Sequence, residues 1–208
     1  MMETVDGRLI VIAGASRTGK TAFTVQQVKD RKRIIAWDPE DQFSTLPGWK
    51  RITTRRELFR AIESPNAAKL AYVAGGNITE EFDFWAASAF FWGRYYGGCV
   101  AIAEELADVT TPSKAPGNWG ILLRRGLKRG ITIFAISQRW SEADKTAFGN
   151  ASEYVCFRLS SGMDVDYMAK RTRIKSEQIA ALQNLQYVRM DAQTGEISDG
   201  TLKFIKKR

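Results

Sequence analysis

The sequence of 208 residues contains no histidine, and this absence removes several kinds of catalysis. Without an imidazole there is no Ser-His-Asp or Cys-His catalytic group, and most zinc chemistry is excluded as well. Any proton transfer must therefore rest on carboxylate, lysine or tyrosine side chains. Only two cysteines are present, Cys99 and Cys156, and both fall in apolar strand-like segments. We expect two reduced thiols in the core rather than a disulfide or a metal pair.

Long hydrophobic runs are lacking too. The most apolar segment, 82–96, is interrupted by Asp83 and Arg94, and it is well short of the roughly 20 apolar residues that a membrane helix needs. The N-terminal segment 1–7 is polar, which is not the pattern of a signal peptide. We therefore expect a soluble cytosolic protein with no stable membrane insertion of its own.

Acidic residues are fewer than basic ones, and 23 against 31 leave a net charge of +8. Such a balance permits binding to nucleic acid or another polyanion, and it is equally compatible with a generically basic soluble protein. With 44% apolar residues, the chain can bury one substantial core. We expect a single domain over residues 1–208.

The strongest motif lies at residues 14–21, which read G-x-x-x-x-G-K-T. It follows the apolar run 9–13 and precedes a segment, 21–28, that can start a helix. This strand–loop–helix order points backbone N–H groups at an anion, so a phosphate-binding loop (P-loop) is favoured over a chance glycine-rich turn. Lys20 is predicted to reach the β- and γ-phosphates, and the Thr21 hydroxyl to bind Mg²⁺. The residues assigned to nucleotide binding are Gly14, Ala15, Ser16, Arg17, Thr18, Gly19, Lys20, Thr21 and Ala22.

Strand-like apolar runs alternate with helix-like stretches along the chain. The expected strands occupy residues 9–13, 33–37, 70–74, 99–103, 131–137 and 154–159. The expected helices occupy residues 21–30, 55–63, 79–96, 118–129 and 141–150. This alternation predicts an α/β fold with a doubly wound, mainly parallel sheet and a core over about residues 8–160. Residues 161–208 are predicted to add two short helices, 164–173 and 176–184, and a hairpin with arms 186–191 and 196–204.

An acidic pair, Glu104 and Glu105, follows the strand 99–103. Ligands bind beyond the carboxyl ends of the strands in this architecture, and this is the Walker B arrangement. The first carboxylate would hold the Mg²⁺ shell and the second would polarise the attacking water. The competing interpretation is a helix N-terminus whose acids match the macrodipole. The P-loop in the same chain favours the catalytic role, although Glu104 stands where an aspartate is usual.

Two other strand ends carry polar side chains. Gln138 follows the strand 131–137 and could touch the γ-phosphate or orient water, or it could merely cap the strand. Asp38 precedes Pro39, and a turn opened by this pair is at least as well supported as a role at the active site.

The segment 119–130 combines an apolar stripe with a cationic face that contains Arg124, Arg125, Lys128 and Arg129. Such a face can be a solvated surface, a DNA contact or a source of arginine fingers. The residues alone favour the solvated surface.

These motifs, in this order, resemble the FtsK/HerA group of P-loop ATPases. The points of likeness are GASRTGKT at 14–21, WDPE at 37–40, AIAEE at 101–105, LLRRGLKRGI at 122–131 and AISQRW at 135–140. The likeness spans roughly residues 8–160. The compact size is similar to that of the genome-packaging ATPases of tailless, internal-membrane icosahedral viruses.

The resemblance implies a RecA-like P-loop NTPase fold and ATP hydrolysis with Mg²⁺ that drives translocation of double-stranded DNA into a capsid. It also implies a homo-oligomeric ring, expected to be a hexamer, with capsid or portal vertex proteins as partners. The place of action would be the host cytoplasm and a virion vertex.

Site roles follow from the same resemblance. Glu104 and Glu105 become the Walker B pair, and Gln138 becomes the sensor. The loop 108–118, with Lys114 in it, would face the channel of the ring. The candidates for an arginine finger acting on a neighbouring subunit are Arg124, Arg125 and Arg129.

Three alternatives stay open. A filamentous-phage assembly ATPase shares the general pattern, but such proteins usually continue into a membrane segment. A small-molecule or nucleotide kinase would need a mobile lid, for which 164–173 is a candidate, yet the acidic pair favours water as the acceptor. A P-loop fold that serves only as a scaffold is disfavoured by intact Lys20, Thr21 and Glu105.

Overall fold

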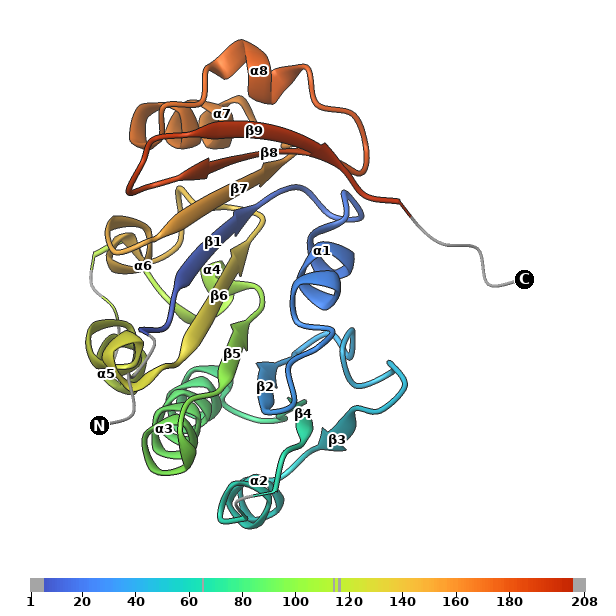
Figure 1. Cartoon of the computed structure of the whole chain (residues 1–208), viewed down its shortest axis with the longest axis vertical. Coiled ribbons are helices and arrows are strands. Elements are labelled where there is room, and N and C mark those ends of the chain that lie inside the picture. The colour runs from blue at the N-terminus through green and yellow to red at the C-terminus, as the bar shows by residue number, and fades with distance from the viewer. Residues whose placement is uncertain (1–5, 65, 114, 116, 204–208) are drawn as a thin grey trace.

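The computed structural model describes residues 6–64, 66–113, 115 and 117–203. Within these residues a nine-stranded sheet forms the centre of the molecule, in the order β3-β4-β2-β5-β6-β1-β7-β8-β9 (Figure 1). The strands from β3 to β7 in this order are parallel neighbours, and β8 and β9 are added in antiparallel fashion. The strands are β1 Leu9–Ala13, β2 Ile34–Trp37, β3 Lys50–Ile52, β4 Lys69–Tyr72, β5 Val100–Ala103, β6 Thr132–Ser137, β7 Glu153–Phe157, β8 Gln186–Asp191 and β9 Ile197–Thr201.

Helices occupy the connections between the strands, except those from β2 to β3 and from β8 to β9. They are α1 Lys20–Gln27, α2 Arg55–Ile62, α3 Ile78–Tyr96, α4 Leu106–Val109, α5 Gly117–Arg125, the 3₁₀ helix η1 Leu127–Arg129, α6 Lys145–Gly149, α7 Gly162–Arg171 and α8 Ser176–Ala180. The predicted α/β fold, with its mainly parallel sheet and C-terminal hairpin, is therefore confirmed.

Several predicted elements end earlier in the structure, such as the helix predicted over 176–184, which ends at Ala180, and the hairpin arm predicted over 196–204, which spans Ile197–Thr201. Four further details differ from the sequence prediction. The edge strand β3 and the one-turn helix α4 were not predicted, because β3 is short and polar and α4 is a single turn. The helix predicted over 118–129 ends at Arg125 and continues as η1 after Gly126, a poor helix former. The helix predicted over 141–150 begins only at Lys145, because the Asp144 carboxylate caps it by accepting the backbone N–H groups of Thr146 and Ala147.

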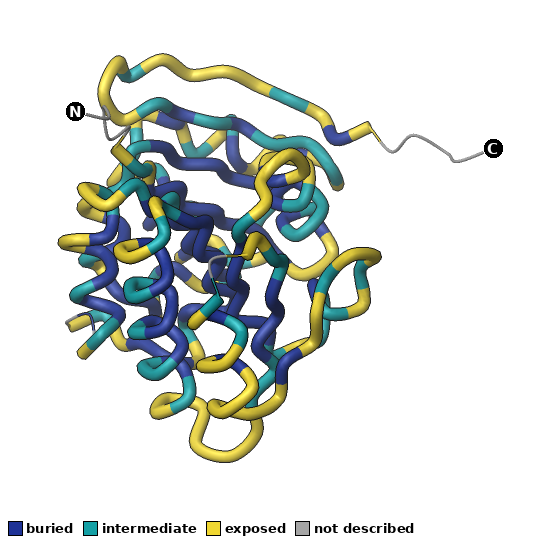
Figure 2. The backbone as a smooth tube through the Cα atoms, turned by 60° about the horizontal axis from the view of Figure 1, so that its bottom comes forward, coloured by how far each residue is buried: buried dark blue, intermediate teal, exposed yellow. Residues whose placement is uncertain are grey.

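The strand β1 shows why the central strands are almost wholly apolar. Leu9 and Val11 point into one hydrophobic cluster, while Ile10 and Ile12 point into another on the opposite face of the sheet. Both faces are therefore covered, and alternate residues of one strand serve two cores. In Figure 2 the central segments of the backbone are coloured as buried and the surrounding loops mostly as exposed.

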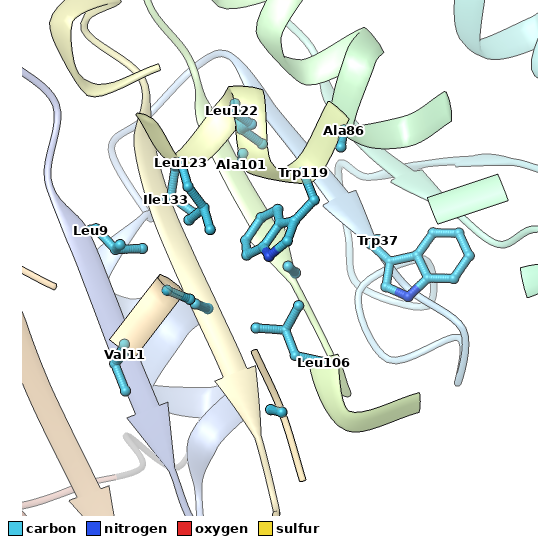
Figure 3. Packing of buried hydrophobic residues seen from close by; sticks show 14 of the residues in the cluster. Leu9, Val11, Trp37, Ala86, Ala101, Leu106, Trp119, Leu122, Leu123 and Ile133 are labelled. Carbon is cyan, nitrogen blue, oxygen red and sulfur yellow. The ribbon is translucent and has the colours of Figure 1, made fainter. Parts of the chain in front are cut away.

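The larger cluster lies under α3, α5 and α6, and the smaller one under α1 (Figure 1). In Figure 3 the indole of Trp119 extends from α5 toward the strands, beside Leu122 and Leu123. Its Nε1 donates to Asp144 Oδ2 at 3.2 Å, so the buried polar atom of this ring is satisfied.

Both cysteines are buried free thiols, as predicted. Burial raises the pKa of the Cys99 thiol to about 12, which keeps it protonated and unreactive. Among the described residues, no helix combines the length and the apolar character that crossing a membrane requires.

Candidate active site

The conformation of the loop between β1 and α1 depends on the two glycines of its motif, Gly14 and Gly19. Gly19 has φ +119°, and a Cβ there would lie 2.7 Å from Leu202 Cδ1. A Cβ at Gly14 would lie 2.7 Å from the Cβ of Phe157. The loop is anchored to the neighbouring strand by a hydrogen bond of 2.9 Å from Ala15 N to the carbonyl of Arg158. Side chains are thus excluded at two points where the loop backbone packs closely against Phe157 and Leu202.

Lys20 opens α1 and is buried although it carries an ammonium group. Its Nζ donates to the carbonyl of Ala15 across the loop at 3.1 Å. Burial lowers the pKa of this group, while the nearby charges of Glu105 and Glu104 act in the opposite direction. A buried ammonium at the N-terminus of a helix, beside a loop of backbone N–H groups, is an environment suited to phosphate.

A pocket of about 440 Å³ lies over this loop. It brings the predicted nucleotide residues Ser16, Arg17, Gly19, Lys20, Thr21 and Ala22 together with Glu105 and Gln138. Three further lining residues, Glu40, Gln42 and Leu185, are not among the predicted site residues.

Glu104 lies at the end of β5 and is only 2% exposed. The Thr21 hydroxyl is 3.4 Å from Glu104 Oε1, and Glu104 Oε2 is buried without a hydrogen-bond partner. Burial raises the pKa of this carboxyl to about 8, and the charge of Lys20 opposes the shift. A buried carboxylate oxygen without a donor is what a bound cation would satisfy, so the residues fit Mg²⁺.

The protein supplies few ligands for such an ion. The described residues hold no cluster of three or more His, Cys, Asp or Glu side chains suited to a metal. Mg²⁺ commonly takes one or two protein ligands and completes its shell with water and phosphate oxygens. Thr21 and Glu104 match that pattern.

Glu105 and Gln138 meet because of the strand order. Strand β6 lies between β1 and β5, so the residue that follows it falls between the P-loop and the acidic pair. Gln138 Nε2 donates to Glu105 Oε1 at 2.7 Å. Burial raises the pKa of Glu105, and the hydrogen bond from Gln138 and the charge of Lys20 lower it.

Asp38 forms the turn that was one of its two predicted roles. Its buried carboxylate accepts backbone N–H groups from Gln42, Phe43 and Ser44 at 2.7–3.1 Å. This is a carboxylate-capped turn, and it brings Gln42 to the pocket. The Asp-Pro pair, with a glutamine three residues after the proline, was the available signal for this arrangement.

The three candidates for an arginine finger lie near the amino ends of the parallel strands, opposite the end at which the P-loop lies. Arg124 and Arg125 end α5, and Arg129 ends η1, just before β6 begins. All three are exposed. The structure therefore does not bring them to the P-loop of their own chain, and their role in a neighbour stays a prediction. Lys114, predicted to face a channel, lies outside the described residues.

Comparison with known proteins finds one relative by sequence and several by structure. No family model matches the chain. Protein P9 of Pseudoalteromonas phage PM2 is 28% identical over 177 residues, which are 84% of this chain and 79% of that protein.

Solved structures with the same fold include the genome packaging NTPase B204 of Sulfolobus turreted icosahedral virus 2 in complex with AMPPCP. It has a TM-score of 0.77 and 14% identity, covering 95% of this chain and 98% of that one. The bacterial conjugative coupling protein TrwBdeltaN70 has a TM-score of 0.67 and 12% identity, covering 98% and 86%. These likenesses confirm the RecA-like P-loop NTPase fold, which the chain shares with a viral genome packaging NTPase and a conjugative coupling protein.

Proposed function

We propose that this protein hydrolyses ATP with Mg²⁺ and uses the energy to move double-stranded DNA during viral genome packaging. The observation that carries the hydrolytic part is the meeting of Lys20, Thr21, Glu105 and Gln138 in one pocket at the carboxyl edge of the sheet. The likeness to a genome packaging NTPase and to a phage protein supports the packaging part.

The residues divide the chemistry between them. The P-loop N–H groups and Lys20 hold the β- and γ-phosphates, and Thr21 with Glu104 would hold the metal, which neutralises phosphate charge when bound. Water attacks the γ-phosphorus, the bond from this phosphorus to the β,γ-bridging oxygen breaks, and ADP leaves. Glu105 takes the proton of the water, and burial raises its pKa toward the value of an effective base. Gln138 holds the Glu105 carboxylate in place.

Water is a better acceptor here than a small molecule. A kinase would need a mobile lid, and the candidate segment α7 is instead anchored. Tyr167 and Met168 are buried in the larger core, and Asp164 accepts a hydrogen bond from the Ser141 hydroxyl at 2.9 Å.

The partners follow from the same proposal. Double-stranded DNA, further copies of this chain in a ring of six, and capsid or portal proteins at a virion vertex are the expected partners, and the host cytoplasm is the expected place of assembly. The net charge of +8 supports a polyanionic partner.

Phosphate release from ATP tests the proposal, measured against protein concentration with and without double-stranded DNA. Lys20→Ala should abolish turnover, and Glu105→Gln should bind ATP without splitting it. Lys29→Ala, an exposed lysine just beyond α1, is the control and should leave turnover unchanged. Full activity of Lys20→Ala would reject the assignment of the P-loop, and turnover indifferent to DNA would count against translocation.

A further inference from the structure

The loop after β2 is held in a fixed shape at the edge of the nucleotide pocket. Asp38 is fully buried, and its two carboxylate oxygens accept the backbone N–H groups of residues 42–44. Phe43 is buried in the smaller core and contacts the ring of Trp49. The backbone of residue 42, between Asp41 and Phe43, is therefore held in place, and its side chain lines the nucleotide pocket.

That residue is Gln42, and its side-chain amide is oriented by Glu40. Gln42 Nε2 donates to Glu40 Oε2 at 2.9 Å. An ionised carboxylate can only accept, so the NH₂ group of the amide faces Glu40 and the carbonyl oxygen faces the other way. On that other side, Gln42 Oε1 accepts the hydrogen bond of the Thr21 hydroxyl.

A threonine hydroxyl has one proton and two lone pairs. If the proton points to Glu104 Oε1, 3.4 Å away, it occupies an oxygen that is needed for the cation. If the proton points to Gln42, the lone pairs of Thr21 and the oxygens of Glu104 are both left for the cation. The outer partner of a metal ligand sets its orientation in this way at many metal sites.

We propose that Gln42 is a positioning residue that accepts the Thr21 proton and so prepares the Thr21 oxygen for the magnesium-bound nucleotide. The inference rests on the proposed nucleotide hydrolysis and adds a residue to it. The turn at Asp38 would then contribute to the site, because that turn determines the position of Gln42.

The test compares nucleotide affinity with and without the ion rather than turnover. A fluorescent ADP analogue is titrated into each variant in excess MgCl₂ and again in EDTA, and the ratio of the two dissociation constants is taken. Gln42→Leu should lower the magnesium-dependent gain about 10–100-fold and leave the dissociation constant in EDTA unchanged. Gln42→Met keeps the length of the side chain and should show the same loss as Gln42→Leu. It replaces the leucine variant in the test if that variant does not fold. Gln26→Leu, at an exposed position of α1, should match the wild type.

A double-mutant cycle with Thr21 separates positioning from a general structural effect. Thr21→Val should lose the magnesium-dependent gain by itself, and adding Gln42→Leu should cost nothing more. Thr21→Ser keeps a hydroxyl and should stay sensitive to Gln42→Leu. An unchanged ratio in both Gln42 variants, or losses that simply add in the double mutant, would overturn the role of Gln42 while the hydrolytic proposal stands. Failure of the wild-type protein to bind the nucleotide at all would reject the proposed function itself.

Discussion

Gln138 and Glu105 are joined by a hydrogen bond of 2.7 Å between Nε2 and Oε1, although they are 33 positions apart in the chain. Glu105 has φ +46°, in the left-handed region that few residues other than glycine adopt. Such a conformation costs about 1–3 kcal/mol and persists only where the surroundings impose it. The amide of Gln138 holds the carboxylate in the pocket, so the contact fixes both the position and the direction of the proposed base.

Replacing Gln138 by alanine should therefore impair chemistry more than binding. We expect ATP turnover to fall by about 10²-fold or more, because a base out of place loses most of its contribution, while ATP affinity stays near the wild-type value. Phosphate release and nucleotide titration measure the two effects separately. Gln193→Ala, in the exposed turn between β8 and β9, is the matched control. Equal turnover in wild type and Gln138→Ala would show that Glu105 needs no partner.

Gly19 should not tolerate a side chain, because of its backbone conformation and because of a close contact. A control variant separates the two effects. The φ of +119° at Gly19 is unfavourable for alanine, and the added Cβ would lie 2.7 Å from Leu202 Cδ1. Gly48 has φ +82° and open space where its Cβ would be, so Gly48→Ala carries the backbone cost alone. That cost is about 1–2 kcal/mol.

We expect Gly19→Ala to lower the free energy of unfolding more than Gly48→Ala and to weaken nucleotide binding, which Gly48→Ala should leave intact. Urea denaturation and nucleotide titration provide the two measurements. A Gly19→Ala variant as stable as Gly48→Ala, with full affinity, would show that Leu202 does not constrain the loop.

The buried carboxyl of Glu104 should make stability depend on pH in the absence of nucleotide and metal. Its pKa is raised from 4.5 to about 8 by burial, so between these values the folded protein binds more protons than the unfolded chain. The free energy of unfolding must then fall as the pH rises through this window. Urea denaturation in EDTA at several pH values measures the slope.

Glu104→Gln, which keeps the shape and removes the ionisation, should flatten that slope. Part of it should remain, because burial also raises the pKa of Glu105. The same slope in wild type and Glu104→Gln would mean that Glu104 stays ionised in the folded protein across this range.

Features that are local in the sequence, or that follow from one general rule, could be predicted from it. The P-loop is a contiguous motif, and the rule that strand ends meet at one edge of a parallel sheet brought Glu105 and Gln138 together. Residues that are placed by longer-range structure could not be predicted in this way. Gln42 reaches Thr21 only because Asp38 turns the intervening loop.

Leu185 illustrates the same limit in the C-terminal segment. It lines the pocket, and its backbone N–H donates to the carbonyl of Thr18 at 3.1 Å. This contact arises because β8 pairs with β7 beside the P-loop strand. The spacing of the hairpin predicts its arms, but nothing local in the sequence predicts which edge of the sheet the hairpin joins.

The placement of the arginines sets up the last prediction. Lys20 lies at the carboxyl edge of the parallel strands, whereas Arg124, Arg125 and Arg129 precede the start of β6 at the amino edge. A single copy of the chain therefore cannot bring one of these arginines to its own nucleotide. If one of them stabilises the transition state, it must come from a neighbouring copy, and turnover must then depend on assembly.

Mixing two inactive variants tests this directly, because Lys20→Ala retains its arginines and an arginine variant retains its P-loop. Each variant alone should lose about 10³-fold or more in turnover, and an equal mixture assembled at random should recover roughly a quarter of the wild-type rate, since that share of interfaces pairs an intact P-loop with an intact arginine. The three alanine variants are mixed separately, so the recovery identifies the residue. Lys128→Ala, exposed on the same 3₁₀ helix, should remain active by itself. If no mixing ratio restores turnover for any of the three variants, the prediction that these arginines act across the interface is wrong. Their cationic face would then be a solvated surface or a DNA contact.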